Sequence, residues 1–152
     1  MKVVVQRVKS ASVTIEGKIH GQINQGYMLL VGFGLNDDEN IVNQMADKVL
    51  RLRVCDDANG KMNLSILDTQ GEILSISQFT LYADASKGRR PSFTDACPPQ
   101  IATKLYDHFN DELGKSGLNI QTGIFQSEMD VQLINSGPIT IILDSDVILK
   151  KR

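Results

Sequence analysis

Three polar residues stand where a short apolar run of the chain ends, and they could take part in acyl transfer. Ser77, Gln78 and Thr80 close the β-branched segment that begins at Ile73. Where a strand gives way to a loop, backbone N–H groups without a ladder partner can stabilise the oxyanion of an acyl-transfer reaction. Hydroxyl residues at such a position also commonly bond to their own backbone. Spacing alone leaves both interpretations open.

A second candidate is the Gly137-Pro138 step, which lies inside a run that otherwise predicts a buried strand. Proline cannot donate to a strand ladder, so it marks an edge, a bulge or a kink. Glycine widens the backbone's choice of conformations, and the step could aim carbonyl oxygens out of the sheet. Only about 5–6% of X-Pro bonds in folded proteins are cis, so the pair alone favours an ordinary turn.

Other catalytic arrangements are weakly supported. Cys97 and His108 could form a nucleophile and a base, but nothing in the sequence brings them together. Neither His20 nor His108 has the spacing of a metal ligand. The segment 32–34 lacks the third glycine and the lysine of a phosphate-binding loop. We therefore expect no metal and no nucleotide cofactor.

Composition indicates one soluble domain of 152 residues, which we place at 1–145, followed by a short basic tail at 146–152. Two cysteines form no disulfide framework, which favours the cytoplasm. The longest apolar run, 27–33, is too short to cross a bilayer. Since the net charge is −2, any contact with nucleic acid must be local, and Lys87, Arg89 and Arg90 are the candidates.

Periodicity predicts an α+β fold with a curved, barrel-like and mostly antiparallel sheet and two main helices. The expected strands are 1–8, 11–15, 18–24, 27–31, 73–77 leading into 78–81, 118–125 and 131–143. The first helix should span about 38–52, behind a capping box of Asn36 and Glu39. The second should begin at Pro98 and Pro99.

The tract 77–83, together with 87–88, 90–93 and Gly137-Pro138, resembles the D-aminoacyl-tRNA deacylase family. Further matching blocks are 6–8, 52–54, 60–65, 105–106 and 122–123. So many blocks in one order are a specific signal. The resemblance implies a cytoplasmic homodimer that hydrolyses the ester of D-aminoacyl-tRNA, and of glycine mischarged on tRNA, without metal or nucleotide cofactor.

The same resemblance implies how chirality is tested. Gly137 and Pro138 match a Gly-cisPro element that reaches into the partner subunit's pocket and holds the substrate's α-amino group on two backbone carbonyl oxygens. Arg7 matches a position that braces this element by donating to its carbonyl groups. An enzyme that accepts many side chains but one chirality should fix the amino group and the ester, and refuse the L-form sterically.

Ser77, Gln78, Phe79 and Thr80 match the opposite wall of that pocket. The implied role of the Phe79 and Thr80 N–H groups is to polarise the ester carbonyl, with Gln78 as a further donor. Thr80 could be named as a nucleophile, but no histidine or lysine is evidently placed to deprotonate it. Attack by water, helped by the neighbouring ribose hydroxyl of the tRNA, is the preferred mechanism.

Phe125 and Met129 match the wall around the terminal adenosine, and the basic cluster could contact acceptor-stem phosphates. The chain departs from the family pattern at Gln126 and Ser127, where small residues commonly follow the phenylalanine, and at Ser136, where aspartate is typical. Two rival functions remain open: a related editing enzyme that removes L-amino acids because its Gly-Pro bond is trans, and an RNA-binding module without catalysis.

Overall fold

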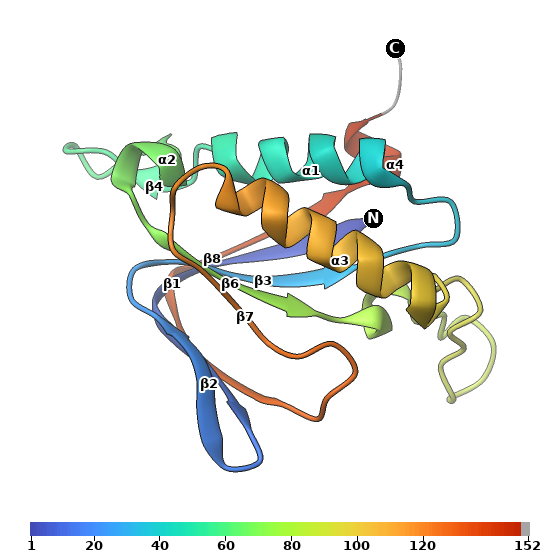
Figure 1. Ribbon diagram of the computed structural model, residues 1–152. Helices are drawn as coiled ribbons and strands as arrows, with labels where there is room; N and C mark the ends of the chain where they lie inside the picture. The colour runs from blue at the N-terminus through green and yellow to red at the C-terminus, as the bar shows by residue number, and fades with distance from the viewer. Residues whose placement is uncertain (150–152) are drawn as a thin grey trace.

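Six strands of the computed structural model, which describes residues 1–149, form one strongly curved sheet (Figure 1). They are β1 (Lys2–Ile15), β2 (Lys18–Ile23), β3 (Gly26–Gly32), β6 (Glu72–Ser77), β7 (Ile120–Thr122) and β8 (Asp130–Asp144). Their order is β2-β1-β3-β6-β7, and β8 pairs with the other edge of β1. Because β2 also contacts β7, the sheet nearly closes into a barrel. The predicted α+β, barrel-like fold is confirmed.

The sheet is mixed. β1 runs antiparallel to β2, β3 and β8, whereas β3 with β6 and β6 with β7 are parallel pairs. The two segments expected at 1–8 and 11–15 are one long strand, because β8 pairs with β1 along most of its length. A separate small hairpin joins β4 (Cys55–Asp56) to β5 (Met62–Leu64).

Two long helices, α1 (Glu39–Arg51) and α3 (Pro99–Gly114), lie on one face of the sheet (Figure 1). The expected central strand, β3, is buried on both faces. Tyr27, Leu29 and Val31 pack in the cluster beneath the helices, and Met28 packs in a second cluster with Leu74 inside the curve of the sheet. Two short helices, α2 (Ile66–Thr69) and α4 (Ser145–Ile148), complete the fold.

Three local predictions were wrong. Asn36 lies in the turn that precedes α1, and Asp38 caps the helix instead, its carboxylate accepting from the Ile41 N–H at 2.9 Å. The segment after β6 does not continue as a strand but turns into the 3-10 helix η1 (Phe79–Tyr82). The expected strand at 118–125 is limited to β7, because the chain turns at 125–126.

The Gly137-Pro138 step is not a turn that ends a strand. Val8 pairs with Asn135 and Gln6 pairs with Thr140, so Arg7 alone stands opposite residues 136–139. The surplus residues must leave the plane of the sheet as a bulge, while β8 continues on both sides. The peptide bond between Gly137 and Pro138 is cis.

The end of the described chain carries α4, which takes up 145–148. Lys150 to Arg152, the basic part of the expected tail, lie outside the described residues. Within 1–149, no helix is both long and apolar enough to span a membrane.

Candidate active site

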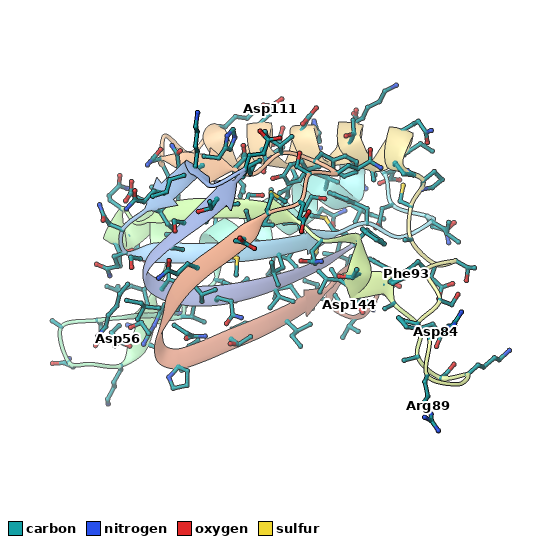
Figure 2. The ribbon with its side chains drawn as sticks, turned by 90° about the horizontal axis from the view of Figure 1, so that it is seen from below. Asp56, Asp84, Arg89, Phe93, Asp111 and Asp144 are labelled. Carbon is teal, nitrogen blue, oxygen red and sulfur yellow. The ribbon has the colours of Figure 1, made fainter. Side chains whose placement is uncertain are left out.

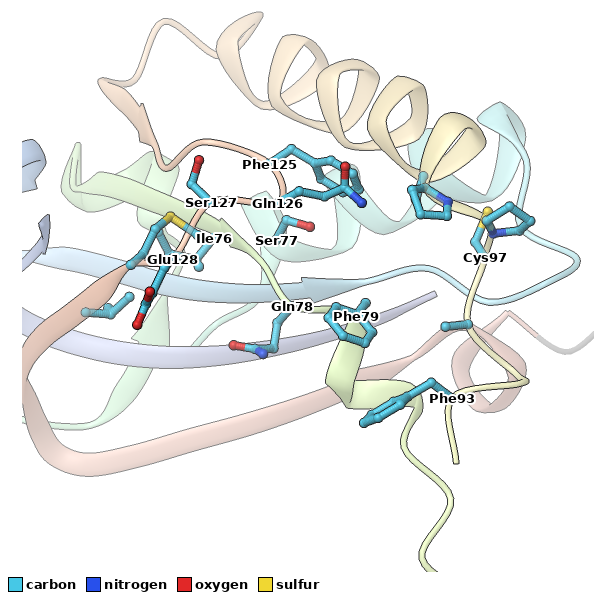
Figure 3. A pocket seen from close by; sticks show the side chains of 16 residues that line it. Ile76, Ser77, Gln78, Phe79, Phe93, Cys97, Phe125, Gln126, Ser127 and Glu128 are labelled. Atoms are coloured by element: carbon cyan, nitrogen blue, oxygen red, sulfur yellow. The ribbon is translucent and has the colours of Figure 1, made fainter. Parts of the chain in front are cut away.

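A pocket of about 610 Å³ opens where β6 ends, between the loop that follows this strand and the first turn of α3 (Figure 3). Its walls consist of residues 76–79, Phe93, 96–99, Ala102, 125–129 and Val131. Five residues that the sequence places in the site lie here together: Ser77, Gln78, Phe79, Phe125 and Met129. The pocket therefore joins the predicted ester-binding wall to the predicted adenosine wall.

The end of β6 supplies free backbone donors at this pocket. The last ladder bond runs from the Gln78 N–H to the Val31 carbonyl at 2.7 Å, after which the chain turns into η1. The first N–H groups of a helix have no partner inside it. Within residues 1–149, neither the Phe79 nor the Thr80 N–H group has an acceptor. Two adjacent donors thus remain without an acceptor, one on the lining residue Phe79 and one on Thr80, which follows it in the chain.

Thr80 follows Phe79 in the chain but is not itself a lining residue of the pocket. Its hydroxyl accepts a hydrogen bond from the Gln78 side-chain amide at 2.5 Å. None of the sixteen lining residues is a histidine, lysine or arginine, and Glu128 is their one acidic side chain. The arrangement therefore offers the Thr80 hydroxyl no basic partner from this wall.

Cys97, which sequence reasoning did not place in the site, forms part of the pocket wall. Burial raises the pKa of its thiol, and the nearby Asp37 carboxylate raises that pKa further. The thiol is consequently a poor nucleophile. The conceivable pair with His108 is not formed, because the His108 Nε2 atom contacts Asn43 at 2.6 Å, away from the pocket lining.

Aromatic side chains shape both sides of the pocket. On one side, Phe125 packs against Tyr106, their ring centroids 6.2 Å apart, and the Tyr106 hydroxyl donates to the Ser75 carbonyl at 2.6 Å. On the other side, Phe79 and Phe93 meet edge to face at 5.1 Å. Phe93 was missed as a site residue, although it belongs to a block that carries the family resemblance. Flat apolar walls of this kind suit a nucleobase.

The basic residues Lys87, Arg89 and Arg90 lie in the exposed loop between η1 and α3. Asp84 and Ser92 close the base of this loop through paired backbone hydrogen bonds, both 2.8 Å long. Phe93, which follows directly, lines the pocket. Figure 2 shows Arg89 at the tip of the loop, beyond Phe93. The loop therefore holds these three basic side chains beside the pocket.

Gly137 and Pro138 are both exposed and do not line this pocket. Arg7, which faces the bulge, pairs with Tyr27, and Tyr27 pairs with Ile73 at the start of β6. Ser77 is four residues further along, or about 13 Å at the rise of a strand. The structure therefore separates the two predicted halves of the site within one chain.

The Arg7 guanidinium makes one hydrogen bond to the bulge and two that fix the guanidinium itself. Nε donates to the Ser136 carbonyl at 3.0 Å, and Nη1 donates to the Val54 carbonyl at 2.8 Å and to the Asp56 carboxylate at 3.0 Å. The Arg7 side chain is 13% exposed. A Cβ at Gly137 would lie 3.2 Å from this guanidinium and 2.8 Å from Ile139, at a φ of +129°. Only glycine fits this point of the bulge without strain.

Asn135 closes the bulge from the other side. Its side-chain oxygen accepts from the Ile139 N–H at 2.7 Å, and its amide nitrogen donates to Gln6 at 2.6 Å and to Thr140 at 3.1 Å. One side chain therefore joins both ends of the bulge to the neighbouring strand, where the regular ladder is interrupted. Sequence reasoning missed Asn135 as a partner of this segment, and Val54 and Asp56 as partners of Arg7.

Comparisons with known proteins all indicate one family. A family model described as D-Tyr-tRNA(Tyr) deacylase matches residues 4–144. A D-aminoacyl-tRNA deacylase of Bacillus velezensis is 56% identical over 145 residues, which cover 95% of this chain and 99% of that protein.

Two solved structures also resemble this chain. The c-Myc DNA unwinding element binding protein matches with a TM-score of 0.90 and 42% identity, over 95% of this chain and 99% of its own. A structure described as a probable eukaryotic D-amino acid tRNA deacylase matches with a TM-score of 0.83 over 93% of this chain and 97% of its own. At 15% identity, this second likeness shows the fold alone.

Replacing Arg7 by lysine should destabilise the protein by about 2 kcal/mol, because an ammonium cannot reach the Ser136 and Val54 carbonyls together and a hydrogen bond to a charged group contributes roughly 1.5–3 kcal/mol. The matched control is Arg53→Lys. Arg53 also donates to a backbone carbonyl, that of Asn63, but is exposed, and we expect a change within about 0.5 kcal/mol. Urea unfolding measures both. Equal stabilities of the two variants would show that Arg7 does not hold the bulge.

Proposed function

The chain belongs to the D-Tyr-tRNA(Tyr) deacylase family, and on this basis we propose that it is a chiral proofreading hydrolase. Its substrate would be D-aminoacyl-tRNA, and its reaction the hydrolysis of the ester between the amino acid and the terminal ribose. One observation of the site carries the proposal: the N–H groups of Phe79 and Thr80 have no acceptor within residues 1–149, and Phe79 lines an aromatic-walled pocket. We propose that the reaction takes place in the cytoplasm, where such a tRNA substrate would be used.

The chemistry we propose relies on backbone donors. The Phe79 and Thr80 N–H groups bind the ester carbonyl oxygen and stabilise the negative charge that develops on it, while the Gln78 side chain positions the ester. Water adds to the carbonyl carbon, the bond to the ribose oxygen breaks, and that oxygen takes up a proton. The neighbouring ribose hydroxyl assists the attack. The products are the free amino acid and tRNA with an intact terminal ribose.

We propose that chirality is tested by a second copy of this chain. The bulge at Gly137 and Pro138 is exposed and lies far along the sheet from its own pocket, so it is available to another subunit. On the outer side of the same strand, Ile134 is 55% exposed and Ile142 is 70% exposed, which suits a homodimer interface.

In this arrangement, carbonyl oxygens of the bulge bind the substrate's α-amino group in the partner's pocket. An L-amino acid held by the same amino group and ester would direct its side chain into the bulge. Glycine has no side chain to exclude, so glycine mischarged on tRNA is proposed as a second substrate.

The tRNA itself would be bound by two further groups of residues. Phe125 and Met129 would line the terminal adenosine, since both belong to the pocket wall beside the ester site. Lys87, Arg89 and Arg90 would contact phosphates of the acceptor stem, because their loop rises next to the pocket.

Paired assays on D- and L-tyrosyl-tRNA test the proposed function. We expect the D-ester to be cleaved at least about 100-fold faster in kcat/KM, a difference of about 2.7 kcal/mol in transition-state binding. Glycyl-tRNA should also be cleaved. Preferred cleavage of the L-ester would indicate the related editing activity of opposite chirality. Tight tRNA binding without cleavage of either ester would indicate an RNA-binding module.

Replacing Thr80 by alanine separates water attack from a threonine nucleophile. The backbone N–H of residue 80 survives this change, so we expect kcat to fall by no more than about tenfold. Near-complete loss of turnover with unchanged substrate binding would instead support Thr80 as the nucleophile.

A contrasting variant replaces Lys87, Arg89 and Arg90 together by alanine. It should raise KM, weaken the salt dependence of binding and leave kcat nearly unchanged, because phosphate contacts affect affinity alone.

Mixed dimers test whether the bulge acts in the partner's pocket. Gln78→Ala should damage the ester wall, and Gly137→Ala should damage the bulge. When both variants are co-expressed, half of the dimers are mixed and each mixed dimer holds one intact pocket, so about a quarter of wild-type activity should return. Activity equal to the mean of the two separate variants, or full activity of a wild-type monomer, would contradict the cross-subunit site.

A further inference from the structure

The residue that braces the bulge carries a positive charge close to the place where the proposed site binds another one. A Cβ at Gly137 would lie 3.2 Å from the Arg7 guanidinium, so this cation lies directly against the backbone of the bulge. The carbonyl groups of the bulge are proposed to bind the substrate's α-amino group, which is an ammonium below its ordinary pKa. Like charges at short range repel each other, and more strongly where water is excluded. An uncompensated Arg7 would therefore weaken binding of the amino group.

Asp56 is the acidic side chain placed to compensate this charge. Its carboxylate accepts from Arg7 Nη1 at 3.0 Å, and it lies on the small hairpin of β4 and β5 (Figure 2). Both residues line a recess of about 440 Å³ beside Ser136. The exposed Lys9 lines the same recess, and Asp56 is the one acidic residue among the nine described residues of its wall. The recess beside the bulge thus contains two cations and one carboxylate.

Folding alone does not account for the Asp56 carboxylate. Two main-chain carbonyl groups, those of Ser136 and Val54, already hold the Arg7 guanidinium. The Asp56 side chain is 50% exposed, and an ion pair exposed to this degree contributes little to stability. Its negative charge, by contrast, acts on any charged ligand bound near the guanidinium once water has been excluded. The ion pair is therefore better explained by the charge of a ligand than by the stability of the chain.

We propose that Asp56 sets how tightly the bulge binds a positively charged amino group, an inference that rests on the proposed function. Asp56 is a positioning residue in this scheme, because it acts through Arg7. It offsets the guanidinium charge, while the guanidinium continues to orient the bulge. Loss of the Asp56 charge should therefore weaken ligands that carry an α-ammonium group and spare ligands that carry a hydroxyl group in its place.

The test measures the affinity of the full-length protein for two uncleavable, amide-linked mimics of D-tyrosyl-adenosine, at about pH 6.5, where an α-amino group is protonated. One mimic carries the α-amino group, and the other carries a hydroxyl group at the same carbon. Asp56→Asn removes the charge but keeps an oxygen that can accept from Arg7. We expect its Kd for the amino mimic to rise about tenfold, which corresponds to about 1.4 kcal/mol, and its Kd for the hydroxyl mimic to change by no more than about twofold. Asp56→Glu, which keeps the charge, should stay within about threefold of the wild type on both mimics.

Asp57→Asn is the matched control, because the neighbouring Asp57 carboxylate accepts instead from the Asn59 and Lys61 N–H groups of its own turn. It should change neither Kd by more than about twofold, and both asparagine variants should melt within about 4 °C of the wild type.

Equal losses on the two mimics, or no loss on either, would overturn the role of Asp56. Failure of the wild type to bind the amino mimic would overturn it as well. If the wild type binds the amino mimic but does not cleave D-tyrosyl-tRNA, the proposed function itself fails, and the Kd values still decide the role of Asp56.

Discussion

The mismatch in register between β1 and β8 is the constraint on which the rest of the site depends. One residue of β1, Arg7, stands opposite four residues of β8, so the surplus backbone must leave the sheet. An extra loop of backbone would ordinarily be mobile, but here Arg7 and Asn135 bond to it from both sides. Their hydrogen bonds replace the ladder that the bulge interrupts, and they hold its carbonyl groups in one orientation.

This way of holding the bulge accounts for serine at position 136, where the family resemblance leads us to expect aspartate. Arg7 Nε donates to the main-chain carbonyl of Ser136, and Arg7 Nη1 donates to the carbonyl of Val54, in the segment between α1 and β4. The brace therefore needs the backbone at 136 and the guanidinium at 7, but not a particular side chain at 136. The same holds at the far end of the sheet, where the donors at Phe79 and Thr80 are also main-chain groups.

The sequence predicted most of the features that depend on residues close together along the chain, and it did not predict those that depend on residues far apart. The stripe of α1 and the doubly buried β3 are properties of neighbouring residues, and both were correctly predicted. The capping error was also local, since Asn36 and Asp38 are both good caps and only the turn before the helix selects Asp38. Taken alone, the Gly137-Pro138 pair favoured a turn over a bulge, because the bulge originates in a pairing with residues more than 120 positions away. No local pattern contains that information.

The pocket illustrates the same limit. Ser77, Gln78 and Phe79, which the sequence assigns to an ester wall, line one pocket, and they could be found because they form a contiguous tract with a family resemblance. Cys97 was not predictable, because its N–H bonds to the Phe33 carbonyl at 2.9 Å and this distant pairing brings the start of α3 to the end of β6. Backbone groups that long-range pairing holds in place would therefore perform the reaction and the chirality test that we propose.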